Sequence, residues 1–371
     1  KVVKIIRREH HNFIAEVIKD EHGYKAVSNG YESIILDEIY PLGTKLLIDG
    51  KTLEVKEVLG HKDDVGTKEK EVLVEYNFPI SFNEEYLKEV NSIEKSLSEE
   101  VIDMDKRNGL KDQRSITSVT IDGDDTKDFD DAVAFHNNTV YVQIADPNRY
   151  IKDNSAMWDE TLRRGISTYF PGCCNPMMHE ILSNGICSLN PNVDRLAISC
   201  IMEITPNGKI VSHDIFESII RSRIQMTYKK VNKILNDEEI PEGYEPFKDD
   251  LKLMWELAKI LRKEKLARGY LDFDVDEPKI LVDENCKPYD VVLREHGKGE
   301  NMIEDFMIAA NETVAEHVFY MGLPFVYRVH EVPDNEKVEE FLNSISMLGY
   351  HVVGDRNFVY PKSMKKILDQ L

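Results

Sequence analysis

The sequence lacks the long apolar runs of a membrane protein. In 371 residues, no stretch approaches the roughly 20 consecutive apolar residues of a membrane-spanning helix, so we expect no membrane partner. The chain begins at Lys1 without the apolar core of a secretory leader. Its five cysteines show no CxxC spacing, and Cys173 and Cys174 are adjacent. This sparse, odd set indicates reduced thiols in the cytoplasm and argues against a disulfide framework or a zinc site.

Positive charge is also scarce. The chain has 47 Lys and Arg against 68 Asp and Glu, a net charge of −21. Affinity for phosphate comes from counterions released by basic side chains, so bulk electrostatics cannot hold nucleic acid here, and the ordinary interpretation of the acids is a solvated surface. A locally basic channel could still bind RNA if metal ions offset the nearest acids. The function therefore depends on whether some of the acids cluster.

The composition predicts a folded protein of several domains. Hydrophobic residues make up 42% of the chain, which is enough for large cores and excludes general disorder. At about 150 residues per domain, the length favours two or three domains.

Residues 1–78 predict a small all-β domain. The sequence Asp49-Gly50 between two apolar runs is a strong hairpin signal. Strands this short and numerous favour a barrel of the OB (cold-shock-like) kind, although this region has few aromatic side chains on which bases could stack. The expected strands are at residues 2–6, 13–18, 33–36, 46–48, 53–58 and 72–76.

The pattern then changes twice. Residues 79–115 predict a connector with one linker helix, because apolar residues recur at helical spacing over 87–101. Residues 116–371 predict a mixed α/β domain. Its expected strands lie at 118–121, 140–144 and 198–204, and its clearest helices lie at 249–269, 303–322 and 334–349, bounded by acidic starts or terminal glycines.

The most informative segment is residues 119–133, which read VTIDGDDTKDFDDAV. An apolar strand delivers Asp122 to its end, and Asp128, Asp130 and Asp131 arrive together before the chain becomes apolar again. Carboxylates this close repel one another unless a cation lies among them. Hard oxygen ligands suit Mg²⁺ or Mn²⁺, and such ions can activate water beside a phosphate.

Two other interpretations compete with a magnesium site. From the pattern alone, a solvated acidic loop without function remains open. A calcium loop of the EF-hand type requires glycine at its sixth position and glutamate at its twelfth. Counted from Asp122, those positions hold Lys127 and Val133, so the spacing excludes the calcium loop.

The acidic segment resembles the first signature of the RNase II/RNB family of exoribonucleases. Residues 164–171, RGISTYFP, and 182–196, LSNGICSLNPNVDRL, resemble further family signatures in the same order. The residues of the third segment are most similar to those of the ribonuclease R branch of the family. In that branch an OB domain of the cold-shock type also precedes the catalytic domain. Three long, ordered matches are far more specific than one acidic motif, and they disfavour the solvated-loop interpretation.

The resemblance implies roles for the four aspartates. In the family they hold Mg²⁺, with Mn²⁺ as a substitute, against the phosphate at the 3′ end of RNA. Asp122, Asp128 and Asp131 match the metal-organising set. Asp130 matches the aspartate whose loss most impairs catalysis.

The resemblance also implies four RNA-binding residues. Tyr169 and Phe273 match two aromatic residues that pack on the terminal nucleotides, which suits a grip independent of sequence. Tyr228, in the basic segment 221–230, and Glu304 match a pair that distinguishes ribose from deoxyribose. From the residues alone, Tyr169 could be a buried aromatic and the basic segment could be an exposed helix start. Glu304 could either line a cavity or bond neighbouring backbone.

The chain departs from the family pattern in two places. Cys173-Cys174-Asn175 replaces apolar residues before the Pro-Met pair, which we expect to alter a loop and leave the chemistry intact. The chain also stops at Leu371, before the arginine-rich signature and the S1 domain of the family. We therefore expect a fragment with an OB-type domain and a catalytic domain truncated at its C-terminus.

These features predict a monomeric, magnesium-dependent, hydrolytic 3′→5′ exoribonuclease. It would degrade single-stranded RNA processively from the 3′ end to nucleoside 5′-monophosphates, while the activity of the truncated chain itself stays open. The alternative is a non-catalytic RNA-binding module that keeps the OB domain and the RNA channel. The GxSxG and P-loop motifs of other enzyme classes do not occur.

Overall fold

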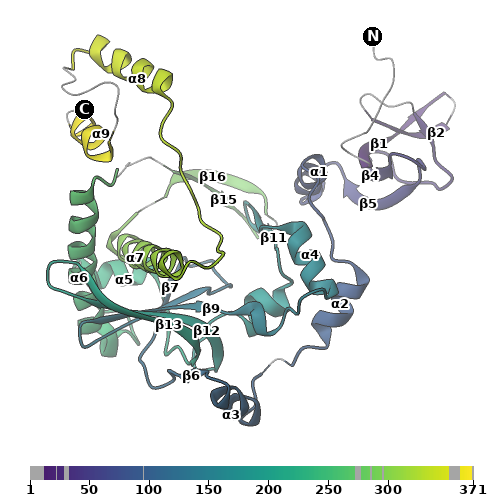
Figure 1. Ribbon diagram of the computed structural model, residues 1–371. Coiled ribbons are helices and arrows are strands. Elements are labelled where there is room, and N and C mark those ends of the chain that lie inside the picture. The colour runs from purple at the N-terminus through teal and green to yellow at the C-terminus, as the bar shows by residue number, and fades with distance from the viewer. Residues whose placement is uncertain are drawn as a thin grey trace. The chain divides into compact units, whose positions relative to one another are not determined.

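The computed structural model forms two compact units, which we describe separately (Figure 1). The first comprises Lys1–Ile93, Tyr150–Glu180 and Glu277–Arg294, and the second comprises Glu94–Arg149, Ile181–Asp276 and Glu295–Leu371. The structure describes residues 12–21, 23–28, 33–94, 96–271, 277–284, 286–294, 296–350 and 360–369. The strand expected at residues 2–6 lies outside these ranges. No helix in these ranges has the length and apolar character that crossing a bilayer requires.

The first unit begins with an antiparallel sheet in the order β3-β2-β1-β4-β5. Burial alternates along β1, as expected of a strand with one face on a core. The Asp49 side chain accepts hydrogen bonds from the backbone N–H groups of Lys51 (2.8 Å) and Thr52 (3.1 Å), which confirms the predicted hairpin. In the described residues β3 and β5 are not paired, so the structure shows a β domain and not a closed barrel. The strands are β1 (Asn12–Asp20), β2 (Gly23–Val27), β3 (Ile34–Ile35), β4 (Thr44–Asp49) and β5 (Val55–His61).

Two predictions in this region are wrong. Residues 72–76, expected to be a strand, belong mainly to helix α1 (Thr67–Glu75), whose Lys68 and Glu71 form an ion pair one turn apart (2.7 Å). The single linker helix expected over 87–101 is two helices, α2 (Glu84–Asn91) and α3 (Glu99–Arg107). Ser98 starts the second one, because its hydroxyl accepts a hydrogen bond from the Val101 N–H (3.3 Å).

The rest of the first unit consists of one helix and two hairpins. Helix α4 (Ala156–Arg164) packs against α2, and the Glu89 carboxylate accepts hydrogen bonds from the first N–H groups of α4. One hairpin joins β10 (Thr168–Phe170) to β11 (Cys173–Asn175), and the other joins β15 (Pro278–Val282) to β16 (Pro288–Leu293).

The second unit is a five-stranded sheet with helices packed on it, in the order β6-β13-β12-β9-β8. Helix α7 packs on β9 and β12, and α6 packs on β8 and α7 (Figure 1). The predicted strands near residues 120, 140 and 200 are confirmed, as are the three predicted helices and the glycine ends of two of them, Gly269 and Gly322. The strands are β6 (Lys111–Asp112), β7 (Thr120–Asp122), β8 (Asp131–His136), β9 (Thr139–Ala145), β12 (Arg195–Ile204), β13 (Ile210–Ile220) and β14 (Gln225–Thr227). The helices are α3, α5 (Tyr228–Leu235), α6 (Lys248–Arg268), α7 (Lys298–Met321), α8 (Asn335–Met347) and α9 (Pro361–Leu368).

Candidate active site

The acidic segment is a loop between two strands of the second unit. Asp122 is the last residue of β7, and Asp131 is the first residue of β8. A pair of backbone hydrogen bonds between Val119 and Val133, both 2.9 Å, holds the two strands together before the loop leaves them. The two ends of the loop therefore meet at one sheet edge, and the aspartates at both ends meet with them.

Residues 182–196, which resemble a further family signature, hold the backbone of the acidic loop by hydrogen bonds. The Ser188 hydroxyl accepts a hydrogen bond from the Phe129 N–H (3.0 Å) and donates one to the Lys127 carbonyl (3.1 Å). The Leu189 N–H donates to the Phe129 carbonyl (2.9 Å). Phe129 itself is buried in a cluster with Leu189. The backbone on both sides of Asp128 is thus fixed, a role of Ser188 that the motif contained and sequence reasoning did not assign.

The carboxylates repel one another. Burial, together with Asp131, Asp130 and Asp128, raises the pKa of Asp122 from 3.8 to about 7. Burial and Asp130 raise the pKa of Asp131 to about 6. The Asp130 side chain is exposed, yet neighbouring atoms desolvate its carboxylate, and this desolvation and Asp128 raise its pKa as well. Every charged group that shifts these three pKa values is another acid.

This donor set fits a hard divalent cation. The buried Oδ2 atom of Asp122 has no hydrogen-bond partner, and a cation would satisfy it and relieve the repulsion. Within the described ranges, no three His, Cys, Asp or Glu side chains are already arranged as a metal-binding group. The chemistry of the four aspartates thus favours a cation, while the ligand geometry is not preformed.

Tyr228 lies close in register to the acidic loop. Strand β14 pairs in parallel with β7, which sets Thr227 opposite Asp122, and Tyr228 follows Thr227 as the first residue of α5. Tyr228 is partly buried against the start of α7, where a Cβ added to Gly299 would lie 3.5 Å from its Cδ1 atom. The parallel strands thus place the backbone of Tyr228 one residue beyond the position opposite Asp122, while its predicted role with Glu304 stays a prediction.

Much of the basic segment around Tyr228 has structural contacts. The Arg221 Nε atom lies 2.7 Å from an Asp194 oxygen. The Arg223 guanidinium donates to the Arg114 carbonyl (2.8 Å). These two cations therefore hold neighbouring parts of the second unit together, and they are less available to phosphate than the sequence suggests.

Glu304 has its described contacts at helix α6. Its carboxylate lies 3.4 Å from Lys265 Nζ and 3.6 Å from an Arg262 nitrogen, and it accepts a hydrogen bond from the Tyr270 hydroxyl (3.3 Å). The same two basic side chains also bind the buried Asp305. Glu304 is thus part of an ionic network between α6 and α7.

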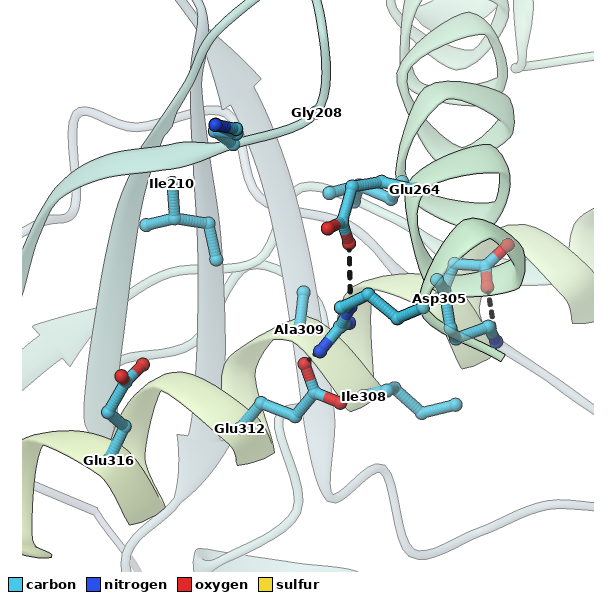
Figure 2. A pocket seen from close by; sticks show the side chains of 12 residues that line it. Gly208, Ile210, Glu264, Asp305, Ile308, Ala309, Glu312 and Glu316 are labelled. Atoms are coloured by element: carbon cyan, nitrogen blue, oxygen red, sulfur yellow. Dashed lines mark hydrogen bonds and ion pairs between the residues drawn. The ribbon is translucent and has the colours of Figure 1, made fainter. Parts of the chain in front are cut away.

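A pocket of about 280 Å³ lies beside this network, between α6, α7 and the β12–β13 turn (Figure 2). Lys265 and Arg268 in its wall are both paired, with Asp305 and Glu264 respectively (both 2.8 Å). None of the four aspartates of the acidic loop lines it. The pocket and the acidic loop are therefore separate features of the second unit.

Two predicted residues remain, Tyr169 and Phe273. Tyr169 is on β10 in the first unit, with 68% of its surface exposed, as a stacking side chain requires and as a buried aromatic would not be. Phe273 lies outside the described residues. The structure therefore brings Asp122, Asp128, Asp130 and Asp131 together, places Tyr228 beside them in register, and leaves Tyr169 and Glu304 to be tested.

Comparison with known proteins identifies the family. The family model described as the RNB domain matches residues 110–371. Ribonuclease R of Thermotoga maritima is 40% identical over 332 residues, which cover 87% of this chain and 46% of the relative. This chain spans about half the length of the curated relatives that it matches.

Solved structures agree with this result. The Mycoplasma genitalium RNase R, in complex with ribose-methylated single-stranded RNA, has a TM-score of 0.89 and 26% identity, and the match covers 99% of this chain and 61% of that one. Yeast Ssd1, described as a pseudonuclease, shares the fold with a TM-score of 0.66 and 13% identity, over 99% of this chain and 48% of its own. On the match over residues 110–371, the chain belongs to the RNB domain family.

Proposed function

We propose that this chain carries the active site of a magnesium-dependent, hydrolytic exoribonuclease that acts on the 3′ end of single-stranded RNA. The observation that carries the proposal is the convergence of four aspartates at one sheet edge, where burial and neighbouring carboxylates raise the pKa values of Asp122, Asp130 and Asp131 and one buried oxygen of Asp122 has no hydrogen-bond partner. The ribonuclease R relatives and the RNA complex of the M. genitalium protein support RNA as the substrate class.

The four aspartates would have two roles, metal binding and proton transfer. Asp122, Asp128 and Asp131 would hold Mg²⁺, or Mn²⁺ in its place, and the bound ion would neutralise phosphate charge and acidify water. Asp130 is an exposed residue, and desolvation of its carboxylate and the charge of Asp128 raise its pKa, which suits it to accept the proton of the attacking water. Attack on the terminal phosphorus breaks its bond to the 3′ oxygen of the penultimate nucleotide. The products are a nucleoside 5′-monophosphate and an RNA shorter by one nucleotide, without a covalent enzyme intermediate.

Aromatic and polar residues would hold the RNA. The exposed Tyr169 would stack on a base, and Phe273 would stack on a second one. Because every base has a π-face, this grip is independent of sequence and suits processive degradation. Tyr228 and Glu304 would contact the ribose 2′-hydroxyl, the group that separates RNA from DNA.

We further infer the setting of this activity. The N-terminal sheet and its core of alternating apolar residues support an OB-type domain in residues 1–78, followed by the connector 79–115 and the catalytic domain 116–371. The five cysteines are present as thiols, which supports a reducing compartment such as the cytoplasm. We propose that the protein acts there as a monomer.

The test is Asp130→Asn in the full-length protein, with Asp124→Asn, an exposed acid of the same loop, as the matched control. RNA labelled at its 3′ end should release labelled mononucleotide at once with the parent and the control, and RNA labelled at its 5′ end should shorten gradually. Asp130→Asn should bind RNA with parent affinity and release no mononucleotide. Hydrolysis by Asp130→Asn at the parent rate would refute the assignment.

The alternative is a non-catalytic RNA-binding module. Two observations favour it: the described side chains hold no preformed metal-binding group, and the fold also occurs in a protein described as a pseudonuclease. A gel of 3′-labelled RNA with Mg²⁺ separates the two functions. A shifted band without released mononucleotide would indicate the binding module.

A further inference from the structure

The first unit brings cysteines from two distant hairpins together. The β10–β11 hairpin turns at Pro171-Gly172, where Gly172 has φ 79°, the value that the third position of a type II turn requires. Cys173 follows at once as the first residue of β11. The turn of the β15–β16 hairpin contains Cys286, whose φ of 58° is unusual for a residue with a side chain.

The two turns are in direct contact. The Cys286 thiol donates a hydrogen bond to the Gly172 carbonyl, with a sulfur–oxygen distance of 3.5 Å. A Cβ added to Gly172 would lie 3.0 Å from the Cys286 sulfur and 2.7 Å from a methyl carbon of Val282. The Cys286 sulfur therefore packs against the residue that precedes Cys173.

Because Cys173 directly follows Gly172, it belongs to the turn that the Cys286 sulfur contacts. Burial raises the pKa of Cys173, and the charges of Glu69 and Cys286 raise it further. Cys173 is exposed and Cys286 is half-buried, so a small oxidant could reach both sulfurs.

Strand register separates Cys173 from its neighbour Cys174. Successive side chains of a strand point to opposite faces, so only one of the two can face Cys286. Cys173 is the one next to Gly172, which the Cys286 sulfur contacts, and the effect of Cys286 on the pKa of Cys173 agrees with this choice. Cys174 pairs with Tyr169 and Cys173 pairs with Phe170. Side chains of directly paired residues share a face, so Cys174 lies on the face of Tyr169, and Cys173 lies on the reverse face.

We propose that Cys173 and Cys286 are a redox-sensitive pair that forms a disulfide when the protein meets a hydroperoxide. One thiolate attacks the O–O bond of the peroxide and becomes a sulfenic acid, with release of water when the peroxide is H₂O₂. The second thiolate attacks that sulfur and expels a second water. Two thiols are thereby oxidised by two electrons, and one H₂O₂ is reduced to two waters.

The disulfide would link β11 to the β15–β16 hairpin. Because β11 pairs with β10, it would also restrain the strand that carries Tyr169. We expect the oxidised protein to bind single-stranded RNA with a different affinity from the reduced protein, because Tyr169 can no longer move with its hairpin. This consequence rests on the proposed function, whereas the disulfide itself does not.

The test is to oxidise the protein with H₂O₂, block the remaining thiols with an alkylating agent and map the peptides by mass spectrometry. A linked Cys173–Cys286 peptide should form in the parent and in the matched control Cys174→Ser, and dithiothreitol should reverse it. It should be absent from Cys173→Ser and Cys286→Ser. Mapping of the unaltered parent makes the result independent of whether a variant folds.

Three results would overturn the proposal: a Cys173–Cys174 bond as the main product, a Cys174–Cys286 bond as the main product, or peroxide-treated parent in which Cys173 and Cys286 are both alkylated. RNA affinity is then measured for the reduced and oxidised Cys174→Ser protein. An equal affinity would remove the regulatory role and leave the disulfide. A protein that binds no RNA in either state would count against the proposed function alone.

Discussion

Asp122→Asn should stabilise the metal-free protein at neutral pH, although it removes a proposed metal ligand. Asparagine has nearly the same shape as aspartate and carries no charge. The substitution therefore removes the cost of burying a charge at this position and its repulsion by Asp131, Asp130 and Asp128, and it leaves the packing in place. A residue kept only for stability would show the opposite effect.

The magnitude follows from the pKa of Asp122, which rises from 3.8 to about 7. Such a change corresponds to about 4 kcal/mol against the charged form, and we halve it to about 2 kcal/mol because solvent screens this partly exposed group. Between the two pKa values, the folded state holds a proton that the unfolded state has lost. Stability therefore falls as pH rises from about 4 to about 7, and the full penalty is present above pH 7.

The assay is urea unfolding in EDTA from pH 4 to pH 8. Asp122→Asn should exceed the parent by about 2 kcal/mol at pH 8, and the difference should vanish near pH 4. The matched control is Asp124→Asn, because Asp124 lies in the same loop with an exposed side chain. If Asp122→Asn were less stable than the parent at pH 8, the interpretation of a crowded, cation-free cluster would be wrong.

Three further substitutions test one support of the acidic loop and two contacts within the first unit. Ser188→Ala removes the hydrogen bonds to Lys127 and Phe129, so it should cost about 1–3 kcal/mol in urea unfolding and lower kcat for RNA hydrolysis more than it raises KM; an unchanged kcat would contradict this. Arg164→Leu breaks the buried pair with Glu160 (2.9 Å) and should cost about 3–5 kcal/mol in the same assay, whereas a loss below 1 kcal/mol would show that the pair is dispensable. Gly172→Ala places a Cβ at a residue with positive φ, 2.7 Å from a methyl carbon of Val282. Thermal unfolding should therefore show that the folded state is less stable by about 1–3 kcal/mol. A variant as stable as the parent would contradict the packing of the two hairpins.

Local signals predicted much of the fold. Helix α6 has Asp249 and Asp250 in its first turn and ends at Gly269 with φ 104°, and α8 starts after Asp334, whose side chain caps its first N–H groups. The hairpin at Asp49-Gly50 is equally local. These features were predictable because the physical cause lies within a few residues of the effect.

Two elements were predicted wrongly, because tertiary packing or a local helix cap outweighed the pattern of the sequence. Residues 72–76 have the composition of a strand, but most of them belong to helix α1. This helix packs on the protein through one face, on which Thr67 and Leu73 are buried. The linker stripe over 87–101 is continuous in sequence, yet Ser98 caps a new helix within it. The compact units also join segments that are far apart in the chain, which composition along the sequence cannot indicate. The division into 1–78, 79–115 and 116–371 stays a prediction.

Parts of the candidate site could be predicted from the sequence, and other parts could not. The four aspartates share one short loop, so their proximity followed from the sequence. The register of Thr227 opposite Asp122 joins segments about a hundred residues apart, and only the structure shows it. The ionic contacts of Glu304 with Lys265 depend on how α6 and α7 pack, and no sequence pattern contained them.

The most direct test of the central claim is whether Mg²⁺ binding expels protons from the aspartate cluster. Because the pKa values of Asp122 and Asp131 are about 7 and about 6, both groups are partly protonated at pH 6.5 and must ionise to bind a cation. Calorimetric titration of Mg²⁺ in buffers of different ionisation enthalpy should show proton release at pH 6.5 and much less at pH 8.5. Asp124→Asn should behave like the parent, and Asp122→Asn should release fewer protons than the parent, because only Asp131 then remains to ionise. Mg²⁺ binding without proton release at pH 6.5, or equal release from Asp122→Asn, would contradict the account.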